Sequence, residues 1–401
     1  MAHMKPTVPL LILLLLFSPS MVAAQTFKSS VGDLKVETVA RDLVYPWALA
    51  FLPDGRMLVT ERPGRMRIVT RDGKLSAPLA GVPTAFAVSQ AGMLDVALDR
   101  AYAQNRTIYF CFNADADGSV AVARARLDTG EALRLNDVAI IFRQKGPPTN
   151  GKSVACRIAQ AGDGNLFVAL GDHYSDELAP KPAQVLFQYL RRLMGAKMTD
   201  HESAQTLNND IGKIIRIRPN GSVPPDNPFV NRQGALPEIW AYGVRNPEGL
   251  AFNPTDGKLW EQEHGPKGGD EINIVEKGKN YGWPVVSYGV NYDGTPVGSG
   301  NSSMPGMQEP VWQWTPSIAP SGMAFYTGDL FPGWKGSLFN GALKYQLLAR
   351  LELKGDTVVK EERILQGLNE RIRDVRQGPD GALYLLTDND AGRILRQVPA
   401  K

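Results

Sequence analysis

The sequence predicts an all-β fold in which about six similar hairpin units form a β-propeller. One local pattern recurs along the chain: an Asp-Gly turn followed by alternating apolar residues, which is typical of a β-hairpin. The turns are Asp54-Gly55, Asp163-Gly164, Asp256-Gly257 and Asp380-Gly381. Two further strand-like segments, 107–112 (TIYFCF) and 337–343 (SLFNGAL), stand at the same stage of the repeat without the turn. The units follow at irregular intervals of roughly 45 to 90 residues, which suits propeller blades that carry insertions.

A β-sandwich with long loops is the alternative fold, because 29 prolines and 40 glycines would suit its turns. The propeller is favoured because nearly the same strand pattern recurs around the whole chain. Radial repetition leaves few exposed strand edges and brings loops from every blade to one mouth of a central channel. Residues that are far apart in the sequence can therefore meet there. We treat residues 25–401 as a single domain of this kind.

One segment, residues 183–198 (AQVLFQYLRRLMGAKM), has a clear helical pattern. Its apolar residues recur at the spacing of one helix face, at Val185, Leu186, Tyr189, Leu190 and Leu193. We expect a helix inserted between two strands. It could cap the site, mediate formation of a homodimer or pack on the rim of the propeller, and we favour packing on the rim.

Residues 1–24 have the pattern of a secretory signal peptide. Lys5 precedes an apolar run from Leu10 to Phe17, and a small-residue end at Ala24 comes before Gln25. The run is too short to span a bilayer comfortably, and no later stretch approaches about 18 apolar residues. We therefore expect cleavage after Ala24, no stable membrane span, and a periplasmic or secreted location. A retained N-terminal anchor is the alternative.

Export would place the two cysteines, Cys111 and Cys156, in an oxidising compartment where they could pair. Both lie in apolar, strand-like surroundings, where two buried thiols are the commoner arrangement. We expect thiols and keep the disulfide as the alternative.

Charge and motifs exclude some classes of function. The net charge of +3 is small for 401 residues, and no basic run is interleaved with aromatic residues, so we expect no nucleic-acid partner. The sequence has no Gly-x-Ser-x-Gly elbow, no phosphate-binding Gly-x-x-x-x-Gly-Lys-Ser/Thr and no His-Glu-x-x-His zinc helix. With four histidines in all, a zinc site with several histidine ligands is not expected.

The candidate site residues are polar groups placed beside strands or within turns. They are Gln90, Asp172, Arg245, Asn246, Gly265, Pro266, Ser317, Lys344, Arg371 and Arg373. Several cations that converge on one channel mouth would bind a planar ligand with several carboxylates, since the arginine fork matches a carboxylate. The glycine-rich loop around Gly265-Pro266 can offer backbone oxygens to a cation. Taken singly, each of these cations is more often a solvated surface charge.

Taken together, these segments resemble a known family. They include LVYPWALAFLPDGRMLVTERPGRMRIV, QAGMLDVALD, GDGNLFVALGD, EIWAYGVRNPEGLAF, EQEHGPKGGDEIN, NYGWPVVSYG, PSIAPSGMAFYTG and RIRDVRQGPDGALYLLTD. In this order they are similar to the soluble aldose sugar dehydrogenases that use pyrroloquinoline quinone. The resemblance extends from about Val36 to Gln397 and so covers nearly all of the mature chain.

The resemblance implies a six-bladed propeller with the quinone lying over the channel mouth. It implies that the quinone is bound by Arg245, Asn246, Lys344, Arg371 and Arg373, with His264 and Ser317 lining the same pocket. Calcium would be held by the carbonyl oxygens of Gly265 and Pro266, by the quinone and by water. An aldose would be oxidised at its anomeric carbon, and the electrons would pass to an external acceptor. Gln90, Ser153 and Asp172 occupy the catalytic positions.

Ser153 marks a departure from the family pattern. The family has Gly-x-His-Phe-Gly-Ser-Arg where residues 151–157 read GKSVACR, so a serine stands where the base histidine is expected. A serine hydroxyl cannot act as a base near neutral pH without an activating group.

Three explanations are open for this change. His173 could replace the base, although strand alternation would point it away from Asp172. Asp172 could accept the proton directly, or the protein could bind cofactor or sugar without efficient turnover.

Two other functions compete with a dehydrogenase. One is a non-catalytic propeller that binds a carbohydrate or protein partner. The other is a propeller lactonase, which would need a calcium centre rich in carboxylates and asparagines, and the sequence has no such cluster with distinctive spacing.

Overall fold

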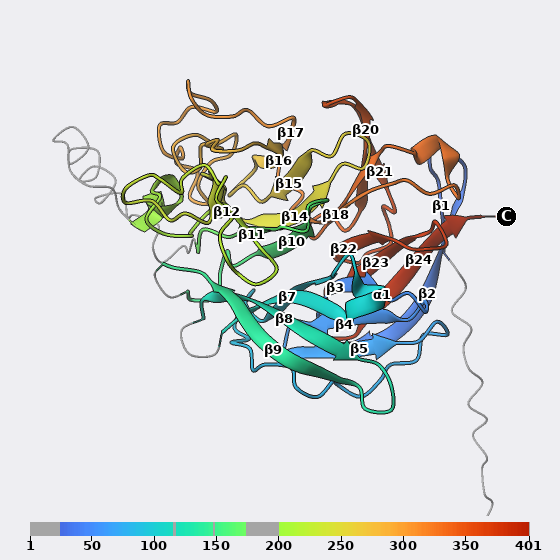
Figure 1. Ribbon diagram of the computed structural model, residues 1–401. Helices are drawn as coiled ribbons and strands as arrows, with labels where there is room; N and C mark the ends of the chain where they lie inside the picture. Colours follow the sequence, from blue (N-terminus) through green and yellow to red (C-terminus); the bar gives the residue numbers. More distant parts are fainter. Residues whose placement is uncertain (1–24, 115–117, 147–148, 174–199, 401) are drawn as a thin grey trace, which may run out of the picture.

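The computed structural model describes residues 25–400, apart from 115–117, 147–148 and 174–199. In this part of the chain, six antiparallel sheets form a ring, and the first strands of successive sheets contact one another around it (Figure 1). The fold is a six-bladed β-propeller, as predicted. The expected signal peptide (1–24) and the expected helix (183–198) lie outside the described residues. Among the described residues, no helix has both the length and the apolar character needed to span a bilayer.

Each of the first five blades is a meander of consecutive strands. The first contains β3 (Pro46–Phe51), β4 (Met57–Glu61) and β5 (Arg65–Val69). The second contains β6 (Met93–Leu98), β7 (Thr107–Asn113), β8 (Val120–Asp128) and β9 (Arg134–Arg143). The third contains β10 (Cys156–Gln160), β11 (Leu166–Leu170), β12 (Lys213–Ile217) and β13 (Ile239–Tyr242). The fourth contains β14 (Pro247–Phe252), β15 (Leu259–Glu263), β16 (Asp270–Val275) and β17 (Trp312–Trp314). The fifth contains β18 (Pro320–Phe325), β19 (Leu338–Ala342), β20 (Leu348–Lys354) and β21 (Thr357–Ile364).

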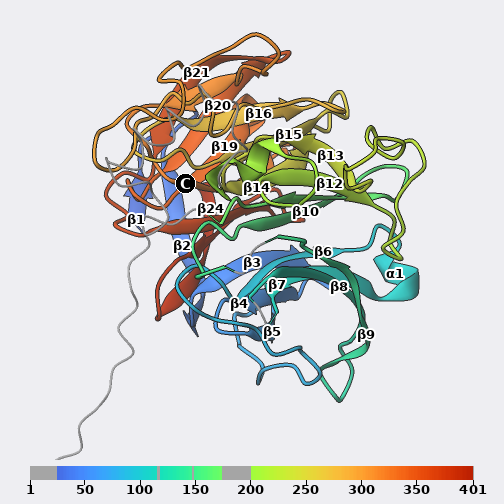
Figure 2. The ribbon, with the colours of Figure 1, turned by 90° about the vertical axis from the view of Figure 1, so that its left-hand side faces the viewer.

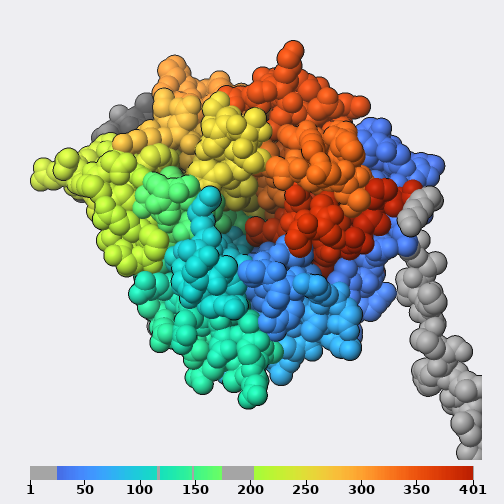
Figure 3. Space-filling view, turned by 45° about the vertical axis from the view of Figure 1, so that its right-hand side comes forward, coloured from blue at the N-terminus to red at the C-terminus, as the bar shows by residue number. Residues whose placement is uncertain are grey.

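The sixth blade combines both ends of the described chain. It contains β1 (Gln25–Phe27), β2 (Leu34–Leu43), β22 (Ile372–Gln377), β23 (Leu383–Thr387) and β24 (Gly392–Pro399). β2 pairs antiparallel with β24, so N-terminal residues complete the sheet begun by the C-terminal strands. Figure 2 shows the first two blades below the third, fourth and fifth, and Figure 3 shows the blue N-terminal residues beside the red C-terminal ones. This pairing closes the ring without an exposed edge between the first and last blades.

Short helical turns join some strands. These are α1 (Tyr102–Asn105), η1 (Asp200–Gln205) and η2 (Pro332–Trp334). The hydrophobic core lies between the faces of neighbouring blades, where Trp47 of the first blade, Phe110 of the second and Val168 of the third belong to one buried cluster.

The four Asp-Gly turns have the same structural role. Each joins the first strand of a blade to the second, as the hairpin pattern predicts. The two segments predicted without this turn are β7 and β19, which are also second strands. The second strand of every blade was therefore identifiable from local sequence.

Alanine recurs where the six first strands approach the axis. The second-last residue of these strands is Ala50, Ala97, Ala159, Ala251, Ala324 or, in the sixth blade, Arg376. A small side chain lets neighbouring first strands come close. Five alanines leave space for one large side chain, the guanidinium of Arg376.

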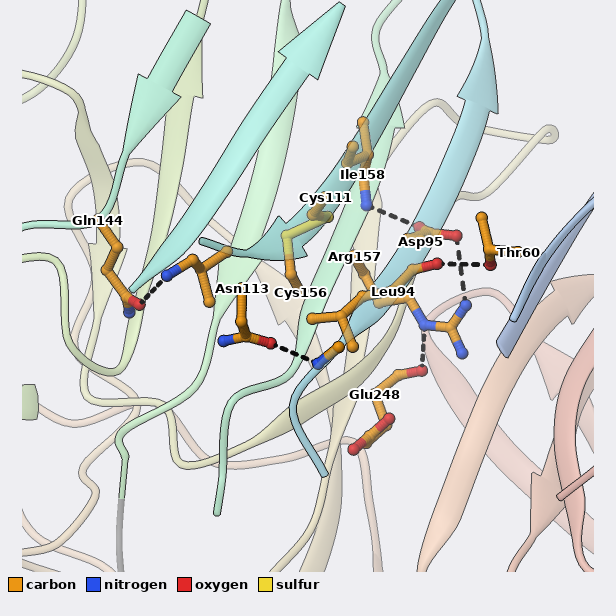
Figure 4. Close-up of a disulfide and its surroundings, with 12 residues drawn as sticks. Thr60, Leu94, Asp95, Cys111, Asn113, Gln144, Cys156, Arg157, Ile158 and Glu248 are labelled. Atoms are coloured by element: carbon orange, nitrogen blue, oxygen red, sulfur yellow. Dashed lines mark hydrogen bonds and ion pairs between the residues drawn. A yellow bond between two sulfur atoms is a disulfide. The ribbon is translucent and has the colours of Figure 1, made fainter. Parts of the chain in front are cut away.

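This guanidinium belongs to a cluster of four charged residues near the axis, which we call the axial plug: Asp95, Arg157, Asp374 and Arg376. Arg376 lies 2.9 Å from Asp95 and 2.8 Å from Asp374, and Arg157 lies 3.1 Å from Asp374. Figure 4 shows Arg157 between Asp95 and Glu248. Two cations and two carboxylates cancel, which is the condition for holding charge in a buried site.

Cys111 and Cys156 form a disulfide, with their Cα atoms 6.3 Å apart (Figure 4). The expectation of two thiols was wrong. Cys111 lies on β7 and Cys156 on β10, so the bond links the second blade to the third. Both cysteines are fully buried. Pairing depended on how closely two blades approach, which the apolar surroundings of each cysteine did not reveal.

Candidate active site

The candidate site residues gather on one face of the propeller, because first and second strands are antiparallel. The start of every first strand therefore lies beside the end of the second strand. Residues that precede or begin a first strand are Gln90, Ser153, Arg245, Asn246, Ser317, Arg371 and Arg373. Residues that follow a second strand are Asp172, His264, Gly265, Pro266 and Lys344. Backbone positions alone thus bring loops from five blades to the same end of the channel.

Two arginines of the sixth blade share one carboxylate. Arg371 donates from Nε and Nη2 to Asp388 Oδ2 at 3.1 and 2.9 Å, and Arg373 Nη2 donates to the same oxygen at 3.3 Å. Burial alone would raise the pKa of Asp388, but the charges of Arg373 and Arg371 hold it below its ordinary value. Asp388 is therefore a carboxylate that fixes two cations at the channel mouth.

Arg373 is also tied to the fourth blade. Its Nη1 lies 3.1 Å from Glu248 Oε2, and the other oxygen of Glu248 accepts from Asn246 Nδ2 at 3.1 Å. Burial alone would lower the pKa of the Arg373 guanidinium, but Asp388 and Glu248 raise it above its ordinary value. Arg373 consequently stays cationic although it is buried.

Asn246 extends the same network to the third blade. Its side-chain oxygen accepts from the backbone N–H of Ala155 at 3.1 Å. Gly171 permits this approach, because a Cβ there would lie 2.9 Å from that oxygen and 2.1 Å from the carbonyl oxygen of Ser153. The asparagine thus connects the cation cluster to the segment that carries Ser153.

Arg245 lies against the loop that carries Gly265. Its Nη1 donates to the carbonyl oxygens of His264 and Gly265, each at 3.0 Å, and its guanidinium stacks on Trp283 at 5.2 Å from the ring centre. The side chain is buried. A carbonyl oxygen has two lone pairs, so this bond leaves Gly265 able to act as a metal ligand.

Asp270 holds the Gly265 loop beside the Ser317 loop. Its carboxylate accepts from the backbone N–H of Gly265 at 2.9 Å and from those of Ile318 and Ala319 at 2.8 and 3.0 Å. Burial raises the pKa of Asp270. His264 donates from Nε2 to the carbonyl oxygen of Pro320 at 2.7 Å, which adds a second link between these loops.

Lys344 is an exposed member of the cation set, as is Arg371. Its backbone N–H donates to the carbonyl oxygen of Ile318 at 3.1 Å, and its ammonium lies 5.5 Å from the ring centre of Tyr345. Lys344 thus differs from Arg371 and Arg373, which are held by ion pairs with Asp388.

The residues present fit the implied cofactor and metal to different degrees. Cations from the fourth, fifth and sixth blades suit a planar ligand with several carboxylates. The carbonyl oxygens of Gly265 and Pro266 are hard ligands of the kind that calcium takes, but calcium needs six to eight oxygens. Two carbonyl groups therefore suit calcium only when a bound ligand and water supply the others. In the described residues, no group of three acidic, histidine or cysteine side chains is placed to hold a metal ion.

Ser153 lies opposite His173 beyond the paired ends of β10 and β11. The N–H of His173 donates to the carbonyl oxygen of Ser153 at 3.0 Å, and the N–H of Ser153 donates to Gln90 Oε1 at 2.8 Å. The structure therefore brings Gln90, Ser153 and the 171–173 segment together.

His173 and Asp172 have different partners. Asp172 Oδ2 accepts from Trp283 Nε1 at 2.6 Å, whereas His173 Nε2 lies 2.9 Å from Gln144 Oε1. The amide nitrogen of Gln144 donates to the carbonyl oxygen of Asp210 at 3.2 Å, so its oxygen faces the imidazole as an acceptor. These contacts turn the ring of His173 toward Gln144, although the positive φ of 56° at His173 shows that strand alternation does not continue this far.

Three residues of the site escaped the sequence reasoning: Glu248, Asp388 and Trp283. Asp388 had a usable signal, because it follows the second strand of its blade as Asp172 does. Glu248 and Trp283 had none, since their partners, Arg373 and Asp172, belong to other blades or lie far along the chain.

Comparison with known proteins identifies a family and several relatives. Residues 43–396 match the family model described as glucose / sorbosone dehydrogenase. The aldose sugar dehydrogenase YliI of Escherichia coli (strain K12) is 40% identical over 386 residues, which cover 95% of this chain and 97% of that protein.

Solved structures give the same result. A crystal structure of a glucose dehydrogenase is 43% identical, with a TM-score of 0.81 and coverage of 91% of this chain and 99% of that one. The PQQ-bound form of the aldose sugar dehydrogenase from Streptomyces coelicolor is 27% identical, with a TM-score of 0.70 and coverage of 91% and 98%. The chain therefore belongs to the glucose / sorbosone dehydrogenase family.

Proposed function

We propose that this protein oxidises aldose sugars at the anomeric carbon with pyrroloquinoline quinone and calcium, and passes the electrons to an external acceptor. The observation that carries the proposal is the cation cluster, in which Arg371 and Arg373 are held by Asp388 and Glu248 on the same face as Arg245. Three arginines fixed before any ligand binds are preorganised for carboxylates. When bound, the quinone polarised by calcium supplies the acceptor for hydride from the sugar.

The proposed cofactor residues have distinct tasks. Arg371 and Arg373 bind carboxylates as rigid forks, and Lys344 closes over the mouth as a mobile cation. Arg245 and Asn246 hold the side nearest the fourth blade. His264 and Ser317 line the pocket, and the carbonyl groups of Gly265 and Pro266 hold calcium.

The part of the site that would accept the proton departs from the family pattern in this chain. Ser153 cannot take the proton of the anomeric hydroxyl unaided, and His173 is directed toward Gln144. Asp172 is the group that we propose as proton acceptor, positioned by Trp283, with Gln90 and Ser153 orienting the sugar hydroxyl. Loss of a general base lowers the rate by about 10² to 10⁴. We therefore propose slow turnover rather than complete inactivity.

The proposed location is periplasmic or secreted. The disulfide between Cys111 and Cys156 supports it, because structural disulfides persist in oxidising compartments.

The direct test is reconstitution of the mature chain with pyrroloquinoline quinone and calcium. We expect a shift in the absorbance of the quinone on binding and slow reduction of an artificial electron acceptor with a panel of aldoses. Failure to take up quinone would exclude the proposal.

A non-catalytic propeller that binds a carbohydrate or protein partner is the second candidate, and Ser153 is the observation that favours it. Quinone uptake by the native chain followed by measurable aldose oxidation would exclude this candidate. Sugar binding without any quinone uptake would favour it.

A further inference from the structure

Arg62 occupies a position in the first blade that other blades give to site residues. It directly follows β4, the second strand of its blade, as Asp172 follows β11, Lys344 lies beyond β19 and Asp388 follows β23. The end of β4 pairs with the start of β3, so Arg62 lies on the site face. The sequence reasoning did not single it out.

The backbone of Arg62 is fixed on both sides. Its N–H donates to the carbonyl oxygen of Tyr45, and its own carbonyl oxygen accepts from Met93 of the second blade, each at 2.9 Å. Gly92 makes this contact possible, because a Cβ there would lie 2.0 Å from the Arg62 oxygen and 2.8 Å from its Cγ. Arg62 is therefore built into the junction of two blades.

The guanidinium is also positioned. It stacks on the ring of Tyr45 at 4.5 Å from the ring centre, and Nη1 donates to the carbonyl oxygen of Ser89. Ser89 precedes Gln90, whose side chain binds the backbone of Ser153. Arg62 thus lies beside the segment that carries Gln90, one of the proposed catalytic residues.

The charge of Arg62 is not matched by a dedicated carboxylate. Among the described residues, none of the carboxylates lies within ion-pair distance of it, although the guanidinium is half-buried. The charges of Asp388, Arg373 and Arg371 act on the pKa of its guanidinium. Three arginines then face two carboxylates, Asp388 and Glu248, which leaves a net positive charge of one at this edge. A half-buried arginine in such a field favours an anion.

We propose that Arg62 is a further ligand-binding residue, which together with Arg371 forms a carboxylate subsite at the edge of the mouth nearest Gln90. The carboxylate has two sources, a carboxyl group of the quinone or the carboxyl group of an acidic aldose such as a uronic acid. The subsite rests on the proposed function, because it assumes that this mouth binds quinone and sugar.

The test compares Arg62→Gln and Arg62→Lys with the matched control Arg218→Gln. Arg218 is an exposed arginine that follows β12, at the opposite end of the propeller. Thermal unfolding checks that each variant is folded. Quinone affinity is measured by absorbance titration, and kcat/KM is measured for galactose and for galacturonate.

If the subsite binds the quinone, Arg62→Gln weakens quinone affinity by about tenfold or more, which is the cost of one charge-assisted hydrogen bond. If the subsite binds the sugar, Arg62→Gln leaves quinone affinity unchanged. Its kcat/KM then falls by about tenfold for galacturonate but not for galactose. Arg62→Lys keeps the charge and loses the fork, so it gives a smaller change of the same kind.

Equal quinone affinity and an equal ratio of the two sugars in Arg62→Gln would overturn the inference. That outcome differs from failure of the proposed function, in which the native chain itself takes up no quinone.

Discussion

The backbone of His173 donates a hydrogen bond to the carbonyl oxygen of Ser153 at 3.0 Å, so the histidine nearest the altered catalytic position is its cross-strand neighbour. Its ring is nevertheless held by Gln144 at 2.9 Å. The chain therefore keeps a histidine beside this position without aiming it at Asp172.

Ser153→His is expected to raise the rate. The N–H of Ser153 that binds Gln90 belongs to the backbone and survives the substitution. The positive φ of 49° at this position is one that histidine adopts more readily than most residues. A general base contributes about 10² to 10⁴, so we expect at least tenfold higher kcat in the reconstituted dye-reduction assay. Ser153→Ala, as control, adds no base and should give no gain in kcat. No gain with histidine would argue against our assignment of the altered base position.

Asp374→Asn is expected to weaken the axial plug. Asp374 accepts from Arg157, from Arg376 and from the backbone N–H of Leu49, and it is buried. The variant leaves two buried cations, Arg157 and Arg376, to share the single carboxylate of Asp95, and breaking a buried ion network costs about 3 kcal/mol or more. Thermal unfolding should show a clearly lower Tm.

The control for this variant is Asp380→Asn, which removes a partly exposed ion pair with Arg396. An exposed pair contributes about 1 kcal/mol or less, so its Tm should change little. Equal shifts in the two variants would contradict the special role of the plug.

Removal of the disulfide by Cys111→Ala with Cys156→Ala should destabilise the fold. The bond closes a loop with a sequence separation of 45 residues. Chain entropy alone predicts a loss of roughly 4 kcal/mol at this loop length. Denaturant unfolding with and without reductant measures it. The native chain should resist reduction until it unfolds, because both sulfur atoms are buried. An unchanged free energy of unfolding in the double variant would contradict this prediction.

Glu261→Gln should flatten the dependence of stability on pH. Burial raises the pKa of Glu261 from 4.5 to about 8, and its side chain accepts a hydrogen bond from Asn273. Because the folded-state pKa is raised, the contribution to stability is full below pH 4.5, declines as the unfolded chain loses its proton, and is lost above about pH 8.

The Tm of the native chain should therefore fall more between pH 5 and pH 8.5 than that of Glu261→Gln, as measured by calorimetry. Part of the slope should remain, because burial also raises the pKa of Glu271 to about 8. The control is Glu276→Gln, at the exposed position that follows β16. It should show the same change of Tm with pH as the native chain. A slope identical in all three proteins would contradict the prediction.

What the sequence predicted depends on how local each signal is. The Asp-Gly turns specify hairpins within about ten residues, so the second strand of each blade and the number of blades followed from sequence. The common face of the candidate residues also followed, because each lies at a strand end. The pairing of Cys111 with Cys156 and of Glu248 with Arg373 did not, since both depend on how closely separate blades approach. The contacts of Arg62 were missed for the same reason.

The pairing of β2 with β24 also determines when this chain can become a complete ring. Residues 34–43 need residues 392–399 as their partner, so the sixth sheet is complete only when both segments are present. A chain that lacks residues 392–399 leaves β2 without its neighbour and separates the loops of Arg62 and Arg371 from a common support. Pairing of these two segments is thus a condition for the complete ring whose site face carries the candidate residues.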